Sequence, residues 1–473
     1  MLAAAVFLIL TPREFAPALA PYAQFKSRGG LPTEIVALED VLADAEAKGA
    51  DDAETVKRYL HRRWSQQGGG DEALRYVLLV GDADVFPVRY MALDRNTEPA
   101  FNYAFYPSDL YFADLAKADG SFEDWNGMRG TPGDAATAFH ATYFGEVRGE
   151  HFKEDPINFD GIDYRPEVGL GRWPVSTRAE AERMVRKSMG YEQSLSNTNL
   201  PMMRATAVFV AVGGWIENRP TMDAWGPYLP AGWGLDKLYW RAEGEVPAPP
   251  DAPHPMPNYP PPTEANVVQA MNDGAGLIVH SGHGWDDGWA ESLTAGALPN
   301  IQNADRLPIM MSAGCSTARF ATLPPYEGYV DIYGVEHAGT NNGEVFTGPP
   351  PAPACYQRGA HNPSGLGEKL LRSSENGAAA YIGCNTGSQP CGMTLAAGFL
   401  ATISSSPGAR AGDCWKGAVT YYWEQERLAD LTPNEDWYPP SIFFQGMKFM
   451  FFGDPTLPMP GPAQLEHPVE SGR

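Results

Sequence analysis

Short apolar runs alternate with amphipathic stretches along most of the chain. A run such as YVLLV at 76–80 has no polar position, which is typical of a strand covered on both faces. A stretch such as 51–64 instead carries its apolar residues at helical spacing. Strand and helix signals in alternation predict a parallel α/β sheet. The predicted strands are 3–10, 33–38, 76–80, 168–175, 205–212, 276–284, 307–315 and 378–385, and the predicted helices are 12–27, 51–64, 264–272 and 364–373, with another directly after 175.

Three segments interrupt this alternation. Residues 92–165 are rich in Asp, Gly and aromatic residues and have little periodicity, so we expect a long surface excursion there. Residues 246–262 are Pro-rich, which is typical of a stiff, extended connector. Residues 322–360 form a loop rich in Gly, Pro and Asn. A loop of this length is either a plain spacer or a lid or binding loop.

The apolar start of the chain, MLAAAVFLIL, admits two interpretations. It resembles the core of a signal peptide, but it has no basic leader and no small-residue cleavage site, and Thr11-Pro12 follows at once. We therefore expect a buried first strand. Elsewhere no apolar run approaches the length of a membrane span, so the sequence predicts no membrane-spanning segment.

Composition and charge narrow the function classes. The 473 residues are 43% hydrophobic, which suits a folded protein with a large core and more than one structural unit. The net charge of −23 disfavours nucleic-acid binding, because phosphate contacts need clustered Lys and Arg. The five cysteines are too few and odd in number for a disulfide scaffold, and no CxxC pair indicates zinc. The sequence indicates no required cofactor.

Two of the predicted strands run directly into residues that carry chemistry. A G-H-G turn at 282–284 follows one run, and a G-C-S turn at 314–316 follows another. Because the carboxyl ends of parallel strands meet at one edge of a sheet, we expect His283 and Cys315 to lie close together. An imidazole can take the proton from a thiol that is otherwise mostly protonated at neutral pH. The backbone amides of Gly284 and Cys315 are the candidate donors to an oxyanion.

Each of these residues taken singly also has an ordinary structural interpretation. A buried cysteine at a strand end is often inert packing, and a histidine in a Gly-rich turn is often a loop residue. The paired strand-end placement favours catalysis. His280 lies on the strand itself, and we expect it to pack against the sheet rather than act. No G-x-S-x-G elbow is present, which argues against a serine hydrolase.

A set of short motifs occurs in one order along the chain. They are YVLLVGD at 76–82, GRWP at 171–174 followed by Tyr191-Glu192, GHG at 282–284 with Trp289, GC at 314–315 with Phe320, the segment 365–385, and FGDPTL at 452–457. Together they resemble the gingipain-type cysteine peptidases, peptidase family C25 of the caspase-like clan. Each motif is short, but the ordered set spans nearly the whole chain, with 32 residues from His283 to Cys315.

The resemblance implies a caspase/gingipain-like three-layer αβα fold with mainly parallel sheets in two subdomains. It places an N-terminal subdomain at 1–200, a catalytic subdomain at 201–462 and a tail at 463–473. It also implies a cysteine endopeptidase that acts on proteins or peptides, with Cys315 as the nucleophile that forms a thioester and His283 as general base and acid. Family habit suggests a secreted or cell-envelope location.

Several positions depart from the family pattern. The residue after G-H-G is Trp285, where serine is usual, and Ala318 replaces a frequent glycine. Members that cleave after basic residues carry an acid that supports the histidine where this chain has Val212. Glu217, in the same loop, is therefore the candidate supporting acid. The acids at 286–287 are further candidates, with a solvated turn as their alternative role.

Substrate and metal binding follow from the resemblance only as expectations. Asp223 aligns with the S1 acid that would pair with Arg or Lys, although an exposed loop acid is the alternative. Pro390 stands where an S1-lining aromatic is usual. Some family members bind calcium, and Asp109, Asp114 and Asp124 lie in a suitable loop without EF-hand spacing. Structural calcium is therefore an expectation without assigned ligands.

The sequence leaves a second function open. Trp285 and Val212 both depart from the catalytic pattern, so the alternative is a non-catalytic or narrowly restricted caspase-like scaffold that binds a protein partner.

Overall fold

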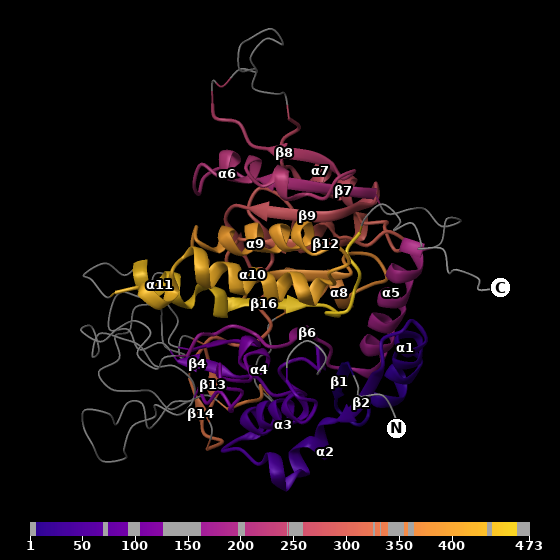
Figure 1. Cartoon of the computed structure of the whole chain (residues 1–473). Helices are drawn as coiled ribbons and strands as arrows, with labels where there is room; N and C mark the ends of the chain where they lie inside the picture. Colours follow the sequence, from indigo (N-terminus) through magenta and orange to yellow (C-terminus); the bar gives the residue numbers. More distant parts are fainter. Residues whose placement is uncertain are drawn as a thin grey trace, which may run out of the picture.

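The computed structural model describes residues 6–69, 74–92, 105–125, 162–196, 204–243, 245, 259–324, 327–331, 333–338, 354–357, 364–432 and 438–460. Within these residues, ten strands form one sheet with helices on both faces (Figure 1). The strands are β1 (Phe7–Thr11), β2 (Thr33–Ala37), β3 (Tyr76–Val80), β6 (Gly169–Trp173), β7 (Arg204–Ala211), β8 (Gly234–Tyr239), β9 (Ala275–Ser281), β12 (Ile309–Ser312), β15 (Ala380–Cys384) and β16 (Phe449–Phe452).

The remaining elements are helices and short antiparallel strand pairs. The helices are α1 (Ala16–Arg28), α2 (Leu38–Ala43), α3 (Asp52–Gln66), α4 (Leu110–Ala113), α5 (Arg178–Ser196), α6 (Arg219–Asp223), α7 (Glu264–Asn272), α8 (Leu366–Arg372), α9 (Gly392–Ser405), α10 (Ala411–Gln425) and α11 (Tyr438–Gln445). The strand pairs are β4 (Tyr90–Ala92) with β5 (Phe105–Pro107), β10 (Gly284–Trp285) with β11 (Gly288–Trp289), and β13 (Tyr329–Val330) with β14 (Glu336–His337).

The sheet changes direction once. Its strand order is β2-β1-β3-β6-β16-β15-β12-β9-β7-β8, and neighbours are parallel except for the antiparallel pair β15 and β16. The N-terminal strands β2, β1, β3 and β6 therefore run opposite to β15, β12, β9, β7 and β8. The carboxyl ends of the two groups face opposite edges, and the second group carries the predicted pair.

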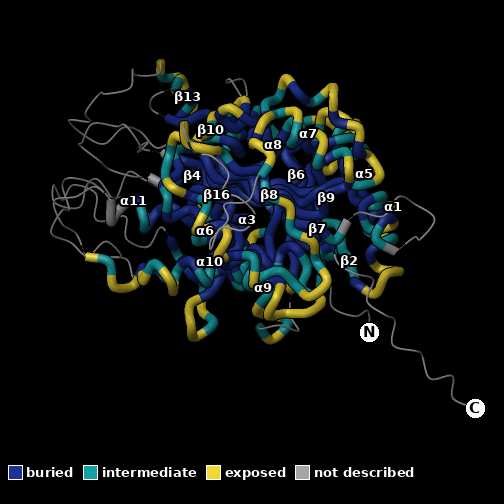
Figure 2. The backbone as a smooth tube through the Cα atoms, turned by 90° about the horizontal axis from the view of Figure 1, so that it is seen from above, coloured by how far each residue is buried: buried dark blue, intermediate teal, exposed yellow. Residues whose placement is uncertain are grey.

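Alternation along the strands builds two cores. Phe7 and Ile9 of β1 pack into one hydrophobic cluster, while Leu8 and Leu10 pack into another, because successive side chains point to opposite faces. Helices α1, α5, α7 and α8 contribute to the first cluster, and α3, α9, α10 and α11 contribute to the second. Seen from above, the buried strands lie between the two helical layers (Figure 2). The predicted three-layer αβα fold is confirmed.

The two groups of strands meet at a close backbone contact. Phe452 of β16 pairs with Arg172 of β6, and the N–H of Gly453 donates to the Arg172 carbonyl oxygen at 2.8 Å. A Cβ atom on Gly171 would lie 2.3 Å from the Gly453 carbonyl oxygen, so only glycine fits there. The GRWP and FGDPTL motifs therefore build the junction of the sheet.

The predicted surface excursion is wrong for residues 106–116. Residues 106–116, which include α4, are all buried. Asp109 accepts two hydrogen bonds from Arg172, both at 2.7 Å, and Asp114 accepts one from the Trp125 indole at 2.6 Å. A segment covered on every side has no polar face, so periodicity did not reveal it. Residues 93–104 and 126–161 of the excursion lie outside the described residues.

Most predicted elements are found with small shifts. Helix α7 spans the predicted residues 264–272, and Asp51 caps α3 by accepting a hydrogen bond from the Glu54 amide at 2.8 Å. The first helix begins at Ala16, so Pro17 and not Pro12 lies in its first turn.

Other predictions fall wholly or partly outside the described residues. Residues 322–360 contain the β13–β14 hairpin, but 339–353 are not described. The subdomain boundary near residue 200, most of the connector 246–262 and the tail 463–473 are not described either. Within the described part of the chain, no helix combines the length and the apolar character needed to cross a bilayer.

Candidate active site

The predicted histidine and cysteine come from neighbouring parallel strands. Strands β9 and β12 pair in register, with His280 opposite Ser312. His283 follows the end of β9 by two residues, and Cys315 follows the end of β12 by three. Both turns therefore leave the sheet at the same edge, as the sequence predicted.

The two turns touch through their glycines. A Cβ atom on Gly284 would lie 2.9 Å from the Cys315 carbonyl oxygen and 2.7 Å from the Thr317 methyl group. A Cβ atom on Gly314 would lie 3.2 Å from the Gly284 nitrogen. Side chains at these glycines would push the turns apart, so glycine allows the backbone beside His283 to reach the backbone of Cys315.

A backbone carbonyl orients His283. The Nε2 atom of His283 lies 3.0 Å from the carbonyl oxygen of Gly214, in the loop after β7. A carbonyl can only accept, so Nε2 carries a proton and the neutral ring keeps its lone pair on Nδ1. His283 is exposed, and its ring lies 6.4 Å from that of Trp215. The geometry thus leaves Nδ1 as the proton acceptor.

Glu217 is not the supporting group in this structure. Its carboxylate bonds Arg219 at 2.7 Å, which lowers the pKa of Glu217, and Arg219 also bonds Glu245 at 2.9 Å. Because Glu217 is paired with Arg219 in the described part of the chain, its carboxylate does not bond the imidazole of His283. The hydrogen-bond partner of His283 is instead the backbone carbonyl of Gly214. A backbone partner cannot be predicted from residue types, because every residue has a carbonyl group.

Asn218 holds the loop that presents this carbonyl. Its buried amide nitrogen donates to the carbonyl oxygens of Val212 and Ser281 at 3.0 and 2.9 Å. Its oxygen accepts from the Trp240 indole at 3.1 Å. Asn218 therefore ties the end of β7 to the end of β9. Sequence analysis missed it, because its partners lie up to 63 residues away.

The acids at 286–287 take the role of turn charges. Asp286 lies 3.6 Å from Arg319, and Asp287 lies 3.5 Å from Lys369. These contacts place both carboxylates beside cations from other segments, Arg319 and the α8 residue Lys369, in keeping with the solvated-turn interpretation.

The thiol of Cys315 rests against the loop that follows β15. The Ser388 N–H donates to Sγ at 3.3 Å, and the Gln445 amide holds the Ser388 hydroxyl at 3.0 Å. Burial raises the pKa of the half-buried Cys315 thiol, and the Ser388 N–H and the charge of Lys448 only partly offset this. The free thiol is therefore mostly protonated at neutral pH, and attack on a carbonyl requires a base.

His283 and Cys315 are each bonded to a loop from a different flanking strand. In the strand order, Gly214 follows β7 and Ser388 follows β15, which flank the central pair of β9 and β12. Within the described residues, His283 and Cys315 share no hydrogen bond, and each is bonded to its flanking loop. Such separation is common before substrate binds, when catalytic hydrogen bonds are often long or absent.

The β10–β11 ladder does not use the Gly284 N–H. The His283 carbonyl accepts from the Ala290 amide at 3.0 Å, so Gly284 and Trp289 form a non-hydrogen-bonded pair in the β10–β11 ladder. The Gly284 N–H therefore points away from β11. The oxyanion roles of the Gly284 and Cys315 amides stay predictions.

His280 packs beneath the site, as predicted. Its ring stacks on Trp289 with centroids 4.2 Å apart, and burial lowers the pKa of His280 to about 3. The Ser312 hydroxyl accepts from the Gly314 amide at 3.1 Å and lies 2.9 Å from His280 Nδ1. The neutral imidazole thus braces the turn that carries Cys315.

The candidate S1 acid already has a cationic partner. Asp223, at the end of α6, accepts from Lys237 at 2.6 Å and from the Tyr239 hydroxyl at 2.9 Å. Helix α6 follows β7, so Asp223 belongs to the same edge of the sheet as His283. The pairing with Lys237, a residue of the edge strand β8, was not visible in the sequence.

No metal cluster is found in the described ranges, where no group of three or more His, Cys, Asp or Glu side chains is arranged to hold an ion. Asp109 and Asp114, two of the candidate calcium ligands, are instead bonded to Arg172 and Trp125. The calcium expectation therefore has no support from these two residues.

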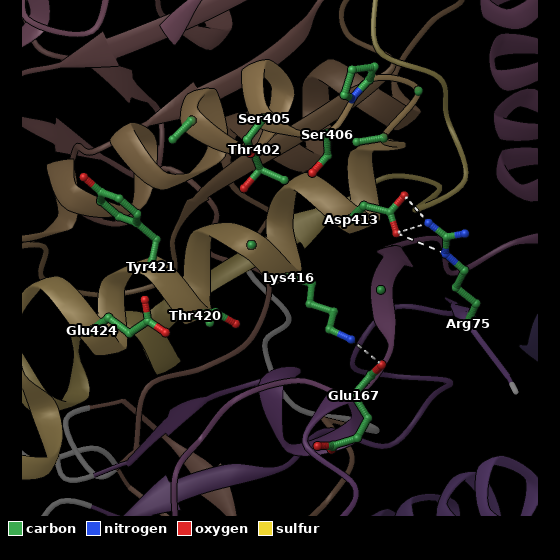
Figure 3. Close-up of a pocket in the computed structure, with 16 residues that line it drawn as sticks. Arg75, Glu167, Thr402, Ser405, Ser406, Asp413, Lys416, Thr420, Tyr421 and Glu424 are labelled. Carbon is green, nitrogen blue, oxygen red and sulfur yellow. Dashed lines mark hydrogen bonds and ion pairs between the residues drawn. The ribbon is translucent and has the colours of Figure 1, made fainter. Parts of the chain in front are cut away.

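A polar cavity of about 690 Å³ lies away from this site, between α9, α10 and the starts of β3 and β6 (Figure 3). Arg75 pairs with Asp413 at 3.1 Å, and Lys416 donates to the Glu167 carbonyl at 2.9 Å. Its charges are largely paired within the chain and neither His283 nor Cys315 lines it. The cavity therefore does not compete as the reactive site.

Known proteins that are similar to this chain belong to one type of peptidase. A model of the family described as peptidase family C25 matches residues 2–460. Gingipain R2 from Porphyromonas gingivalis is 18% identical over 320 residues, which are 66% of this chain and 32% of that protein. Gingipain R1 from Porphyromonas gingivalis is 18% identical over 325 residues, which are 67% of this chain and 24% of that protein. The chain thus spans a third or less of the length of these relatives.

The fold agrees with that of solved relatives. The crystal structure of the Arg specific cysteine proteinase gingipain R matches with a TM-score of 0.58 and 14% identity, over 97% of this chain and 78% of that one. At this level of identity, the likeness concerns the fold alone.

Proposed function

The chain belongs to peptidase family C25, and from this premise we propose that it is a cysteine endopeptidase that works through Cys315 and His283. The observation that carries the proposal is the contact between the two glycine-flanked turns at one edge of the sheet, with His283 held in one tautomer by Gly214. Protein or peptide substrates follow from this proposal.

The proposed reaction is acyl transfer through a thioester. When a peptide enters, Nδ1 of His283 takes the proton of Cys315 and Sγ attacks the scissile carbonyl carbon. The carbonyl oxygen becomes an oxyanion, which the amides of Gly284 and Cys315 stabilise. His283 then gives its proton to the leaving amine, and water activated by the same imidazole hydrolyses the thioester.

Replacing His283 with glutamine tests the role of the base. The glutamine amide can still donate to the Gly214 carbonyl, but it cannot accept a proton. We expect kcat/KM for peptide cleavage to fall roughly 10²- to 10⁴-fold. Alkylation of Cys315 by iodoacetamide, followed by mass spectrometry, should persist and confirm that the turn is intact. Peptide turnover at the unaltered rate in His283→Gln would contradict the proposal.

The scaffold alternative is favoured by one observation, the absence of a hydrogen bond between His283 and Cys315 in the described residues. It predicts that a peptide chloromethyl ketone reacts no faster with Cys315 than a simple alkylating agent does. The peptidase proposal predicts the opposite, because the peptide part places the reactive carbon beside the thiol.

We also propose a preference for Arg or Lys before the scissile bond, which rests on Asp223 and on the Arg specificity in the name of the solved relative. Such a side chain would compete with Lys237 for the same carboxylate. Asp223→Asn should therefore reduce cleavage after Arg and Lys roughly 10- to 100-fold, the effect of one charged hydrogen bond. A peptide library read by mass spectrometry measures this.

Lys237→Met is the matched variant for this prediction. Removal of the competing ammonium leaves Asp223 without a cationic partner, so cleavage after Arg or Lys should increase. If both variants keep the original cleavage profile, Asp223 does not belong to the substrate pocket. The secreted or cell-envelope location stays a prediction from the resemblance.

A further inference from the structure

Trp285 is an exposed tryptophan one residue beyond the candidate oxyanion donor Gly284. Its relative exposure is 48%, whereas Trp125, Trp173 and Trp289 are almost fully buried. Among the described residues, the other exposed large apolar side chains are Tyr333 and Val335, on the β13–β14 hairpin. An isolated exposed apolar residue has no special meaning, so the surroundings of Trp285 decide its role.

The hairpin that carries Trp285 is firmly held. The Ala290 amide donates to the His283 carbonyl at 3.0 Å, and the Leu366 amide donates to the Asp286 carbonyl at 2.7 Å. The Ala295 amide donates to the Asp287 carbonyl at 2.9 Å. Backbone bonds within the hairpin, from the segment that follows it and from α8 thus fix the turn, so the indole is presented to solvent from a braced hairpin rather than from a free loop.

The direction of Trp285 follows from its neighbours. The missing side chain of Gly284 points into the turn at 314–317, where its Cβ would meet Cys315 and Thr317. Successive residues of a strand point to opposite faces, so Trp285, the next residue of β10, projects from the opposite face. Trp285 lies two residues beyond His283 in the chain, at most about 7 Å away between Cα atoms.

A second indole lies near the imidazole. The ring of Trp215 is 6.4 Å from that of His283 and tilted by 46° to it. Trp215 is half-buried and packs against the core, so it is supported from behind. The reacting imidazole therefore has the Trp215 ring beside it in space and Trp285 two residues along the chain, although the chain as a whole is acidic.

We propose that Trp285, together with Trp215, forms an apolar subsite for a large aliphatic or aromatic side chain of the polypeptide substrate, close to the scissile bond. This rests on the proposed peptidase function. A bound peptide brings its scissile carbonyl to Cys315 and its leaving nitrogen to His283. Its neighbouring side chains must then lie close to Trp285, because Trp285 is only two residues from His283 in the chain. Burial of an indole against an apolar side chain removes both from water, and this favours such substrates over polar ones.

Cleavage of a peptide library in which each position near the scissile bond is varied tests the proposal. Trp285→Ala should lower kcat/KM roughly 10- to 100-fold for peptides with a large apolar residue at one position, a loss in the range expected for a truncated apolar pocket. Trp285→Phe should keep most of the rate. Peptides with alanine at that position should be cleaved by Trp285→Ala as fast as by the unaltered protein.

Trp233→Ala is the matched control. Trp233 is a half-buried indole just before β8, at the opposite edge of the sheet, and its removal should leave the profile unchanged. A Trp285→Ala profile equal to that of the unaltered protein overturns the subsite, and so does a change confined to concentration-dependent self-association. An unaltered protein that cleaves no peptide and is not labelled at Cys315 by a peptide ketone overturns the proposed function as well, which separates the two failures.

Discussion

Cys315→Ala is expected to abolish peptide cleavage, with a loss of at least roughly 10⁴-fold in kcat/KM, because no other group can form the thioester. Labelling by a peptide chloromethyl ketone should disappear together with turnover. In the unaltered protein, alkylation of Cys315 should speed up as the pH rises into the alkaline range. The sign follows from burial, which raises the pKa of the thiol and so lowers the thiolate fraction at a given pH.

Cys355→Ser provides the control for this experiment. Cys355 is also half-buried, but burial raises its pKa to about 12, so it should remain unlabelled at neutral pH. Turnover and labelling of Cys355→Ser should equal those of the unaltered protein. Residual peptide cleavage by purified Cys315→Ala would show that the nucleophile is a different group.

Arg172→Met is expected to cause the largest loss of stability, a fall of about 3–5 kcal/mol in the free energy of unfolding. Arg172 is fully buried at the junction of β6 and β16, and it holds Asp109 through two hydrogen bonds of 2.7 Å. It also donates to the carbonyl oxygens of Gly81 and Pro87. Its removal leaves a buried carboxylate without its cation. Urea unfolding followed by tryptophan fluorescence measures the change.

Two further variants sharpen this measurement. Adding Asp109→Asn to Arg172→Met removes the uncompensated charge and should restore part of the lost stability. Arg178→Met removes an exposed cation that pairs with Glu182 within α5, and it should change stability by no more than about 0.5 kcal/mol. A loss below roughly 1 kcal/mol in Arg172→Met would mean that the buried pair does not stabilise the junction.

The sequence by itself determined where the reactive residues lie. Continuous apolar runs ending in glycine predicted that His283 and Cys315 follow adjacent strand ends, and β9 and β12 confirm this. These signals are local, because burial on both faces and a glycine turn are each written within about ten residues. The bounds of α7 were predicted for the same reason.

Only the tertiary structure decided which groups surround that pair. The Gly214 carbonyl lies 69 residues from His283, and the Ser388 amide lies 73 residues from Cys315. Both partners are backbone groups, which nearly every residue carries, so the residue types in the sequence do not predict them. Glu217 appeared suitable by position, but Arg219 holds it, since ion pairs form with whichever charge the fold brings nearest. The burial of Asp109 and the reversal of the sheet at β16 likewise depend on contacts between distant segments, which a local pattern does not contain.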